Sequence, residues 1–409
     1  MSDTLQLGET ETPASEAEPP KRRARMALLR RLSDVVSLPS SRVNSFERSV
    51  TADLLVEILR DADFDERARV ALRISTLAEI PNCLVRLILR DELDIAYPLL
   101  ADSAALSDAD LIDCARNATG AHRRLIAQRR GVSEMVAEIL VEFGETLVVE
   151  ALLRNDQARL SPIAVELIVA MTQHQGQLVP MLLRRPELRP NHAYVLFWWA
   201  DADARRTILQ RFAVSREVLQ EAAGDVFPMA AAEGWQDGLT RKALQFIERR
   251  QRNRAAIERS PFSSLEEAIA VAEEGLTRDV AAEIAHLAGV KPVTGAKIMT
   301  DPGGEGLAVL CKATGLPRAS LRALWRALRR AETDEAGETA PALARVCTIF
   351  DMIAVDRAQT VLRYWNWSLS SAMTPALLKA IREGDDAAMD EFSAPQRAAK
   401  LALGADLKR

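Results

Sequence analysis

Apolar residues recur along most of the chain with the spacing of one face of an α-helix. Val136, Ile139, Leu140 and Phe143 give the clearest case, at positions i, i+3, i+4 and i+7, which lie on one side of a helix. Similar runs follow one another from about Asp53 onward, whereas the apolar–polar alternation typical of strands is nearly absent. The pattern therefore predicts an all-α protein.

Capping residues and helix breakers divide this pattern into short helices. A Ser or Thr can accept hydrogen bonds from the first free amides of a helix, and such residues precede several runs, at Ser107, Ser133, Ser161, Ser264 and Thr374. Prolines and glycines mark turns between helices of about ten to fifteen residues, at Pro81, Pro98, Gly120, Gly131, Gly144, Gly176 and Pro186. Short helices that alternate with short turns favour antiparallel pairs.

Internal similarity indicates a repeat. The segment from Ala105 (ALSDADLIDCARNATGAHRRLIAQRR) parallels the segment from Ala158 (ARLSPIAVELIVAMTQHQGQLVPMLLRR), and residues 287–298 share a shorter pattern with residues 312–324. One such unit cannot bury both of its faces, so neighbouring units must stack. We therefore expect a HEAT-like α-solenoid of stacked antiparallel helix pairs.

Composition shifts divide the chain into regions. Residues 1–20 are acidic and nearly free of large apolar groups, which predicts disorder, and the KRRAR run follows directly. We expect a disordered arm with a basic end (1–25), an N-terminal solenoid (26–238), a basic connector helix (239–262), a second repeat region (263–332), a polar linker (333–342) and C-terminal helices (343–409) docked by Tyr364, Trp365 and Trp367.

Composition and cysteine usage indicate a soluble protein of a reducing compartment. Of the 409 residues, 48% are hydrophobic and the net charge is only -5, so a nucleic-acid partner would need a local basic face. The cysteines are Cys83, Cys114, Cys311 and Cys347, without a CxxC pair, which is typical of reduced thiols. No apolar run is long enough for a signal or a membrane span. We expect a cytoplasmic protein whose oligomeric state the sequence leaves open.

The central region resembles a known bacterial family. The run from Arg129 to Ser161 (RRGVSEMVAEILVEFGETLVVEALLRNDQARLS) is similar to a run in the family called domain of unknown function 2336, at Arg129, Arg130, Val132, Ser133, Gly144, Leu152, Leu153, Asn155, Ala158, Leu160 and Ser161. The segment from Gly303 to Arg318 also resembles this family, and the likeness covers about residues 50 to 330. It implies a helical, HEAT-like fold, and it implies neither an activity nor any functional residue.

No motif predicts catalysis, a metal or a cofactor. The four histidines are scattered without an HExxH pair. The Asp61-x-Asp63-x-Asp65 run begins like a calcium loop, but Glu66 stands where that loop needs glycine, so capping explains it better. The glycine-rich run from Asp301 to Gly306 has no preceding strand and no Gly-Lys-Ser/Thr, which favours an interhelical turn. We expect a protein that is not an enzyme.

Two basic helices and one aromatic cluster are the candidate binding features. Arginines recur on one face of the helix expected over residues 317–330, at Arg318, Arg322, Arg326 and Arg329, and Arg249 and Arg250 belong to a second basic helix. Solvated, acid-paired faces are the ordinary explanation of such stripes. Trp198 and Trp199 form the largest aromatic cluster, in which we expect one ring in the core and the other in a groove.

These features support two functions and a weaker third. A protein-interaction scaffold or regulatory adaptor is the leading hypothesis, because stacked helix pairs present long surfaces to partners. The alternative is nucleic-acid binding through the arginine stripes, with a steep dependence on salt. A cryptic hydrolase or glycosylase would use Trp199 and Asp201.

Overall fold

The computed structural model describes residues 20–39, 41–214, 218, 254–371, 374–383 and 391–407. Regular structure in these ranges is helical, apart from an isolated antiparallel bridge between Thr333 and Thr339. The chain divides into two compact units, residues 1–159 and 160–409. The predicted all-α class is confirmed.

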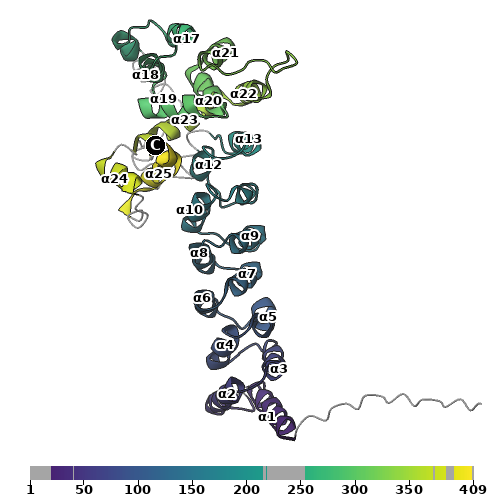
Figure 1. The fold of residues 1–409 in the computed structure, drawn as a ribbon. Coiled ribbons are helices and arrows are strands. Elements are labelled where there is room, and N and C mark those ends of the chain that lie inside the picture. Colours follow the sequence, from purple (N-terminus) through teal and green to yellow (C-terminus); the bar gives the residue numbers. More distant parts are fainter. Residues whose placement is uncertain are drawn as a thin grey trace, which may run out of the picture. The chain divides into compact units, whose positions relative to one another are not determined.

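Unit 1 is a stack of helix pairs in two rows (Figure 1). Helices of odd number pack on one another in one row and helices of even number in the other. The helices of this unit are α1 (Pro20–Val36), α2 (Ser45–Arg60), α3 (Phe64–Ile74), α4 (Asn82–Leu89), α5 (Leu93–Asp102), α6 (Asp108–Asn117), α7 (Gly120–Gln128), α8 (Glu134–Glu142) and α9 (Thr146–Arg154). This arrangement confirms the predicted solenoid-like packing.

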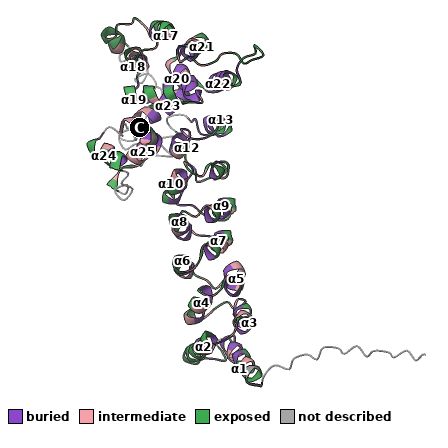
Figure 2. Cartoon of the chain, in the orientation of Figure 1, coloured by how far each residue is buried: buried purple, intermediate pink, exposed green. Residues whose placement is uncertain are grey.

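Amphipathic faces hold the rows together. The helices of unit 1 carry both buried and exposed residues, purple and green in Figure 2, and most of the buried ones are apolar. In α8 these are Val136, Ala137, Leu140 and Val141, all at most 2% exposed. Because each pair covers only its neighbours, stability in such a stack is the sum of local interfaces.

Several predicted caps are present. Ser133 accepts a hydrogen bond from the Val136 amide at 3.3 Å, and Ser161 accepts one from Ala164 at 3.1 Å. Ser107 forms a complete capping box with Asp110. The Asp61–Asp65 run also serves as capping structure, with Asp63 as the N-cap of α3.

Two local expectations were wrong. Pro98 lies inside α5 rather than in a turn, because burial of the neighbouring Leu99 and Leu100 outweighs one missing backbone hydrogen bond. The basic end of the predicted arm is also helical, since α1 begins at Pro20. Its Arg, Ala and Leu residues are strong helix formers, and Leu29 and Val36 are buried.

Unit 2 is built around a central helix, α20. Its residues 305–311 are all buried, as expected of a helix that neighbours cover on every side, and α19, α21, α22 and α23 pack on it. The helices are α10 (Pro162–Met171), α11 (Val179–Leu182), α12 (Pro190–Leu196), α13 (Ala202–Arg211), α17 (Leu265–Glu274), α18 (Arg278–Leu287), α19 (Pro292–Thr300), α20 (Glu305–Thr314), α21 (Arg318–Ala327), α22 (Pro341–Met352), α23 (Val355–Ser370), α24 (Pro375–Glu383) and α25 (Ala394–Leu407), with a 3₁₀ turn at Gly176–Leu178.

The predicted region boundaries fall partly outside the described residues. Residues 1–19 and most of the expected connector, 239–262, are among those not described, so these regions stay predictions. The expected linker at 333–342 contains the bridge between Thr333 and Thr339, and α22 begins at Pro341.

Candidate functional site

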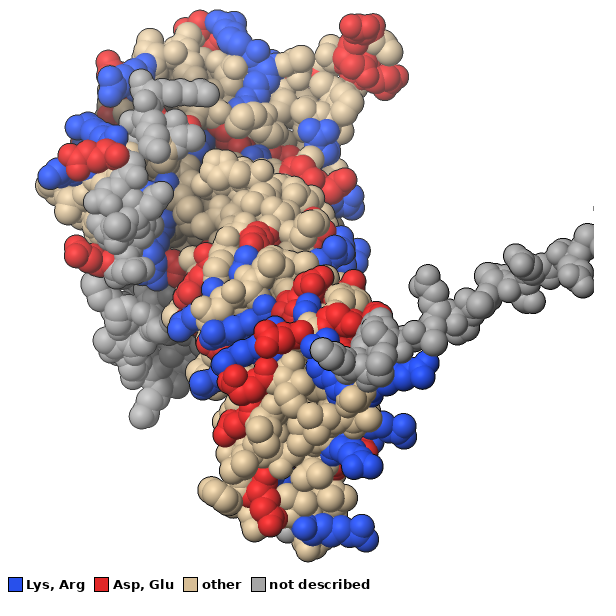
Figure 3. Space-filling view, turned by 60° about the horizontal axis from the view of Figure 1, so that its bottom comes forward, with Lys and Arg blue, Asp and Glu red and all other residues tan. Residues whose placement is uncertain are grey.

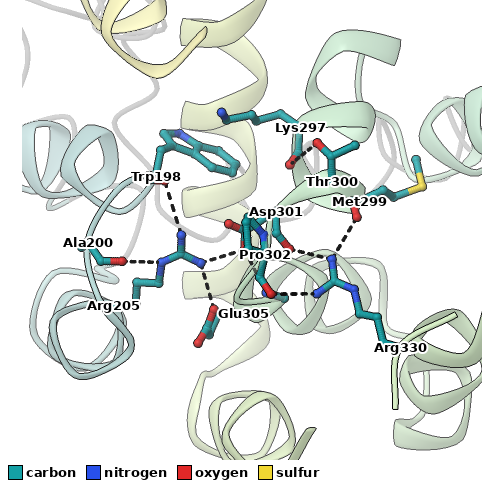
Figure 4. Close-up of polar contacts among 11 residues, drawn as sticks. Trp198, Ala200, Arg205, Lys297, Met299, Thr300, Asp301, Pro302, Glu305 and Arg330 are labelled. Carbon is teal, nitrogen blue, oxygen red and sulfur yellow. Dashed lines mark hydrogen bonds and ion pairs between the residues drawn. The ribbon is translucent and has the colours of Figure 1, made fainter. Parts of the chain in front are cut away.

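The largest buried polar cluster in the described part of unit 2 surrounds the turn between α19 and α20. Arg205 of α13 is 6% exposed and lies between two carboxylates. Its Nη1 donates to Asp301 Oδ2 at 2.8 Å and to Glu305 Oε2 at 2.9 Å. Its Nε donates to the Ala200 carbonyl at 2.9 Å. Figure 4 shows the guanidinium reaching the turn from one side.

Arg330 holds the same turn from the other side (Figure 4). Its Nη2 donates to the Asp301 carbonyl at 2.6 Å and to the Met299 carbonyl at 3.1 Å. These carbonyls belong to the end of α19, where a cation is favoured by the helix dipole. We call Arg205, Asp301, Glu305 and Arg330 the turn clamp.

The glycines of the turn allow the clamp to close. Gly304 has φ of 80°, and its amide donates to Asp301 Oδ2 at 3.0 Å. A Cβ on Gly304 would lie 2.5 Å from the Trp325 ring, and one on Gly303 would overlap the Glu305 carboxylate. The predicted interhelical turn is therefore confirmed, and its glycines are required by the clamp.

Burial dominates the electrostatics of the clamp. It raises the pKa of Asp301 despite the opposing effect of Arg205, because one guanidinium cannot fully offset two buried carboxylates. Burial also lowers the pKa of Arg330. Glu305 Oε1 is buried without a hydrogen-bond partner among the described residues. The clamp thus joins α13, the turn between α19 and α20, and the residues that follow α21, and it contains no nucleophile.

An aromatic cluster packs beside the clamp. The Trp198 ring lies 4.8 Å from that of Trp365 and 5.5 Å from that of Phe197, between centroids. Trp365 is fully buried and donates from Nε1 to the Tyr194 carbonyl at 3.1 Å. Trp365 therefore docks α23, one of the helices of the predicted C-terminal region, on α12.

Of the two predicted tryptophans, one is in the core. Trp198 is 7% exposed, and its carbonyl accepts a hydrogen bond from Arg205, so it is a structural residue. Trp199 is half-buried and donates from Nε1 to Thr172 Oγ1 at 2.9 Å. Asp201 caps α13 through the Ala204 amide at 2.8 Å. These contacts weaken the glycosylase-like hypothesis.

The predicted arginine stripe is shorter than expected, and acids occupy part of it. Helix α21 ends at Ala327, and Arg329 has φ of 56°, so Arg329 leaves the helical face because a turn reverses the chain there. Arg318 contacts Asp351 at 3.0 Å. Arg326 contacts Glu273 at 2.7 Å and Glu332 at 3.1 Å. Arg322 is exposed, and Arg249 and Arg250 lie outside the described residues.

Two of the cysteine thiols are buried and weakly acidic. Burial raises the pKa of Cys114 and of Cys311 to about 12, which keeps both as unreactive thiols. All four cysteines are free. Within the described ranges, no group of three or more His, Cys, Asp or Glu residues is arranged to hold a metal ion.

Large apolar side chains are exposed on helices of both units, and on α10 of unit 2 these are Ile163 and Leu167, at 57% and 37%. On α2, Phe46, Val50 and Leu54 are 75%, 43% and 52% exposed, and their spacing of four residues places them on one helix face. We call these three residues the α2 stripe. The α2 stripe was not predicted from the sequence, although its i, i+4, i+8 spacing is that of residues on one helix face. Other helices of unit 1 expose one or two such residues each, at Leu28, Phe64, Leu72, Tyr97, Met135 and Leu147.

Charges of both signs are mixed over the visible surface. In Figure 3, lysine and arginine side chains are interspersed with aspartate and glutamate, and stretches of uncharged residues lie between them. Such a mixed surface differs from the continuous basic face typical of nucleic-acid binding. None of the helices in the described ranges has the length and apolar character needed to cross a membrane.

A comparison with protein families extends the resemblance found in the sequence. No curated protein and no solved structure matches the chain. A family model described as "Uncharacterised protein conserved in bacteria (DUF2336)" matches residues 95–363, well over half of the 409 residues. The matched range includes both resembling segments and the turn clamp carboxylates Asp301 and Glu305. The chain therefore belongs to the bacterial DUF2336 family.

Proposed function

We propose that the protein is a non-catalytic scaffold or regulatory adaptor that binds partner proteins on the helical-repeat surface of unit 1. The α2 stripe is the observation that supports this function. A helix normally buries its apolar face, yet α2 buries one face through Leu55 and Leu59 and exposes a second one. Apolar side chains exposed together on a helix face mark sites of protein interaction.

The arrangement of unit 1 also supports a binding role. Stacked pairs present extended surfaces without needing a cavity, and large apolar residues are exposed on α3, α5, α8 and α9 as well. We expect the protein to act in the cytoplasm, which agrees with its free cysteines.

A capture experiment tests this function. The immobilised full chain is compared with a variant that carries Phe46→Ser, Val50→Ser and Leu54→Ser, using a bacterial extract and quantitative mass spectrometry. A matched control carries Val355→Ser, which removes an apolar side chain that is 43% exposed in unit 2. We expect proteins retained by the wild-type chain and the control to be lost from the stripe variant. Identical profiles for all three chains would contradict the proposal.

Nucleic-acid binding stays the alternative prediction. The ion pairs of Arg318 and Arg326 with acids reduce the charge that their helix offers to phosphates. Gel retardation at low salt that Arg322→Ala weakens would favour this alternative, whereas no retardation at any salt concentration would count against it.

A further inference from the structure

A groove between α1 and α3 carries positive charge that the described residues do not neutralise. It has a volume of about 710 Å³, and Met26, Leu29 and Val70 form its apolar part. Arg30 and Arg31 line it from α1, and Arg69 and Arg73 line it from α3. We call this the α1–α3 groove.

The two acids of the groove are already engaged. Asp34 pairs with Arg73. Glu66 is 2% exposed, pairs with Arg25 at 2.9 Å, and completes the capping box of α3.

The remaining three arginines have no carboxylate partner within the described ranges. Arg30, Arg31 and Arg69 are all exposed, and the Arg69 guanidinium contacts only the Met26 sulfur, at 3.3 Å, among the hydrogen-bond acceptors of the described residues. Arginines on both walls of an apolar groove suit a segment that combines carboxylates with apolar side chains.

The chain itself contains such a segment, which directly precedes α1 in the sequence. Residues 1–19 have five acids, Asp3, Glu9, Glu11, Glu16 and Glu18, and no lysine or arginine. Leu5 and Leu7 stand among them and supply apolar side chains. The charge of this segment is therefore complementary to that of the groove.

The segment is long enough to reach the groove of its own chain. Leu29 lies nine residues beyond Pro20, the first residue of α1, or about 14 Å along the helix at about 1.5 Å per residue. Eight to fourteen residues separate position 19 from positions 5–11, and an extended chain of that length spans about 26–46 Å. A short tether also gives an effective concentration of about 1 mM.

We propose that the acidic segment of residues 1–19 binds in the α1–α3 groove of its own chain. Its carboxylates pair with Arg30, Arg31 and Arg69, and Leu5 and Leu7 contact the apolar part of the groove. This surface is distinct from the α2 stripe, so the proposal does not depend on the proposed function.

A labelled synthetic peptide of residues 1–19 tests the proposal by fluorescence anisotropy at low salt. Its binding is measured to the wild-type full chain and to a neutral-arm full chain that carries Asp3→Asn and Glu→Gln at positions 9, 11, 16 and 18. We expect the neutral-arm chain to bind the peptide at least ten times more tightly than wild type, because the tethered wild-type segment competes.

Substitutions in the groove locate the binding site. Adding Arg30→Ala and Arg69→Ala to the neutral-arm chain is expected to weaken peptide binding at least tenfold. Arg86→Ala with Arg124→Ala, which removes the same charge from exposed positions on α4 and α7, is the control and is expected to preserve binding. Circular dichroism of each variant verifies its fold.

Three outcomes would overturn the proposal. The neutral-arm chain fails to bind the peptide, the groove substitutions leave its affinity unchanged, or wild type binds as tightly as the neutral-arm chain. The last result would mean that the groove binds this segment only when it belongs to another molecule, and not when it belongs to the same chain. None of these outcomes alters the capture test of the α2 stripe.

Discussion

Unit 1 and unit 2 differ in how deeply their ion pairs are buried. The ion pairs described in unit 1 keep at least one side chain partly exposed, as in Arg123–Glu145, at 10% and 34%, and Arg90–Asp113, at 50% and 39%. Unit 2 buries Arg205 with Asp301 and Glu305, whose side chains are 7%, 2% and 1% exposed. Surface pairs contribute little to stability, whereas a buried pair is costly to break.

This difference indicates where substitutions act locally and where they act on a whole unit. A stack of pairs tolerates change at one interface because each pair contacts only its neighbours. In unit 2, the turn clamp joins α13 and the residues after α21 to the turn between α19 and α20, so the loss of one clamp residue affects all of these segments. The six tryptophans all lie at position 198 or beyond, and their fluorescence therefore reports unit 2 alone.

Arg205→Ala is expected to have the largest effect. It leaves two buried carboxylates without their cation, which typically costs about 3–5 kcal/mol. Chemical unfolding followed by tryptophan fluorescence measures the loss. Arg206→Ala is the control, since Arg206 is exposed and such changes stay within about 0.5 kcal/mol. Equal effects of the two substitutions would show that the turn clamp does not stabilise unit 2.

Gly304→Ala is expected to rank second. Gly304 and Gly315 both have φ of 80°, so alanine at either position costs about 1–2 kcal/mol through backbone strain. Only at Gly304 does the new Cβ meet the Trp325 ring, which adds about 1–3 kcal/mol by overpacking. Unfolding of Gly304→Ala and Gly315→Ala by the same fluorescence assay isolates the clash. Equal losses would show that the turn has room for a side chain.

A pH series should show opposite slopes for one carboxylate in each unit. Burial raises the pKa of Asp301, so the unfolded chain loses that proton first, and the contribution of Asp301 declines as pH rises from the ordinary aspartate value through the raised one. A hydrogen bond from Arg123 lowers the pKa of Glu145. Its contribution is full above the ordinary glutamate value and is lost as pH falls through the lowered one.

Two variants measure these slopes by urea unfolding across about pH 3–6. The stability of wild type relative to Asp301→Asn should fall with rising pH, and fluorescence follows it. The stability of wild type relative to Glu145→Gln should rise with pH, and circular dichroism follows it. Slopes of the same sign would contradict the electrostatic contrast between the units.

The smallest effect on stability is expected from the α2 stripe. Phe46→Ser with Leu54→Ser changes exposed side chains, so each should shift the free energy of unfolding by no more than about 0.5 kcal/mol. Leu55→Ala, at a fully buried neighbour, should cost about 2–5 kcal/mol. Thermal unfolding by circular dichroism compares them. A large loss of stability in the stripe variant would show that the α2 stripe stabilises the fold of unit 1.

Local patterns in the sequence were sufficient to predict the fold class. Caps such as Ser133 and Ser161 act within one helix, so their effect can be predicted from neighbouring residues. Phe143, which was predicted on the apolar face with Leu140, is instead the C-cap of α8 and is 40% exposed. Pro98 was predicted to lie in a turn, but it lies inside α5 because the packing of its neighbours overrides its effect as a helix breaker. Arg329 was predicted to lie on the arginine-bearing face of a helix, because the arginine spacing continues in the sequence after α21 has ended at Ala327.

The buried site could not be predicted because its parts are distant in the chain. Asp301 and Glu305 flank a turn that the sequence identifies, but Arg205 lies 96 residues before Asp301, and no local pattern pairs them. Trp198 and Trp365 are similarly remote from each other. The α2 stripe was readable in principle, since Phe46, Val50 and Leu54 repeat every four residues, but burial of the opposite face had to be known to interpret it.

Hydrogen exchange of the full chain tests the central claim most directly. The proteins eluted from immobilised wild-type chain are added back, and exchange is measured by mass spectrometry in unit 1 and unit 2. We predict slower exchange over residues 45–60, which contain the α2 stripe, and unchanged exchange over residues 318–327 of α21. Protection confined to α21, with none on α2, would contradict the assignment of partner binding to unit 1.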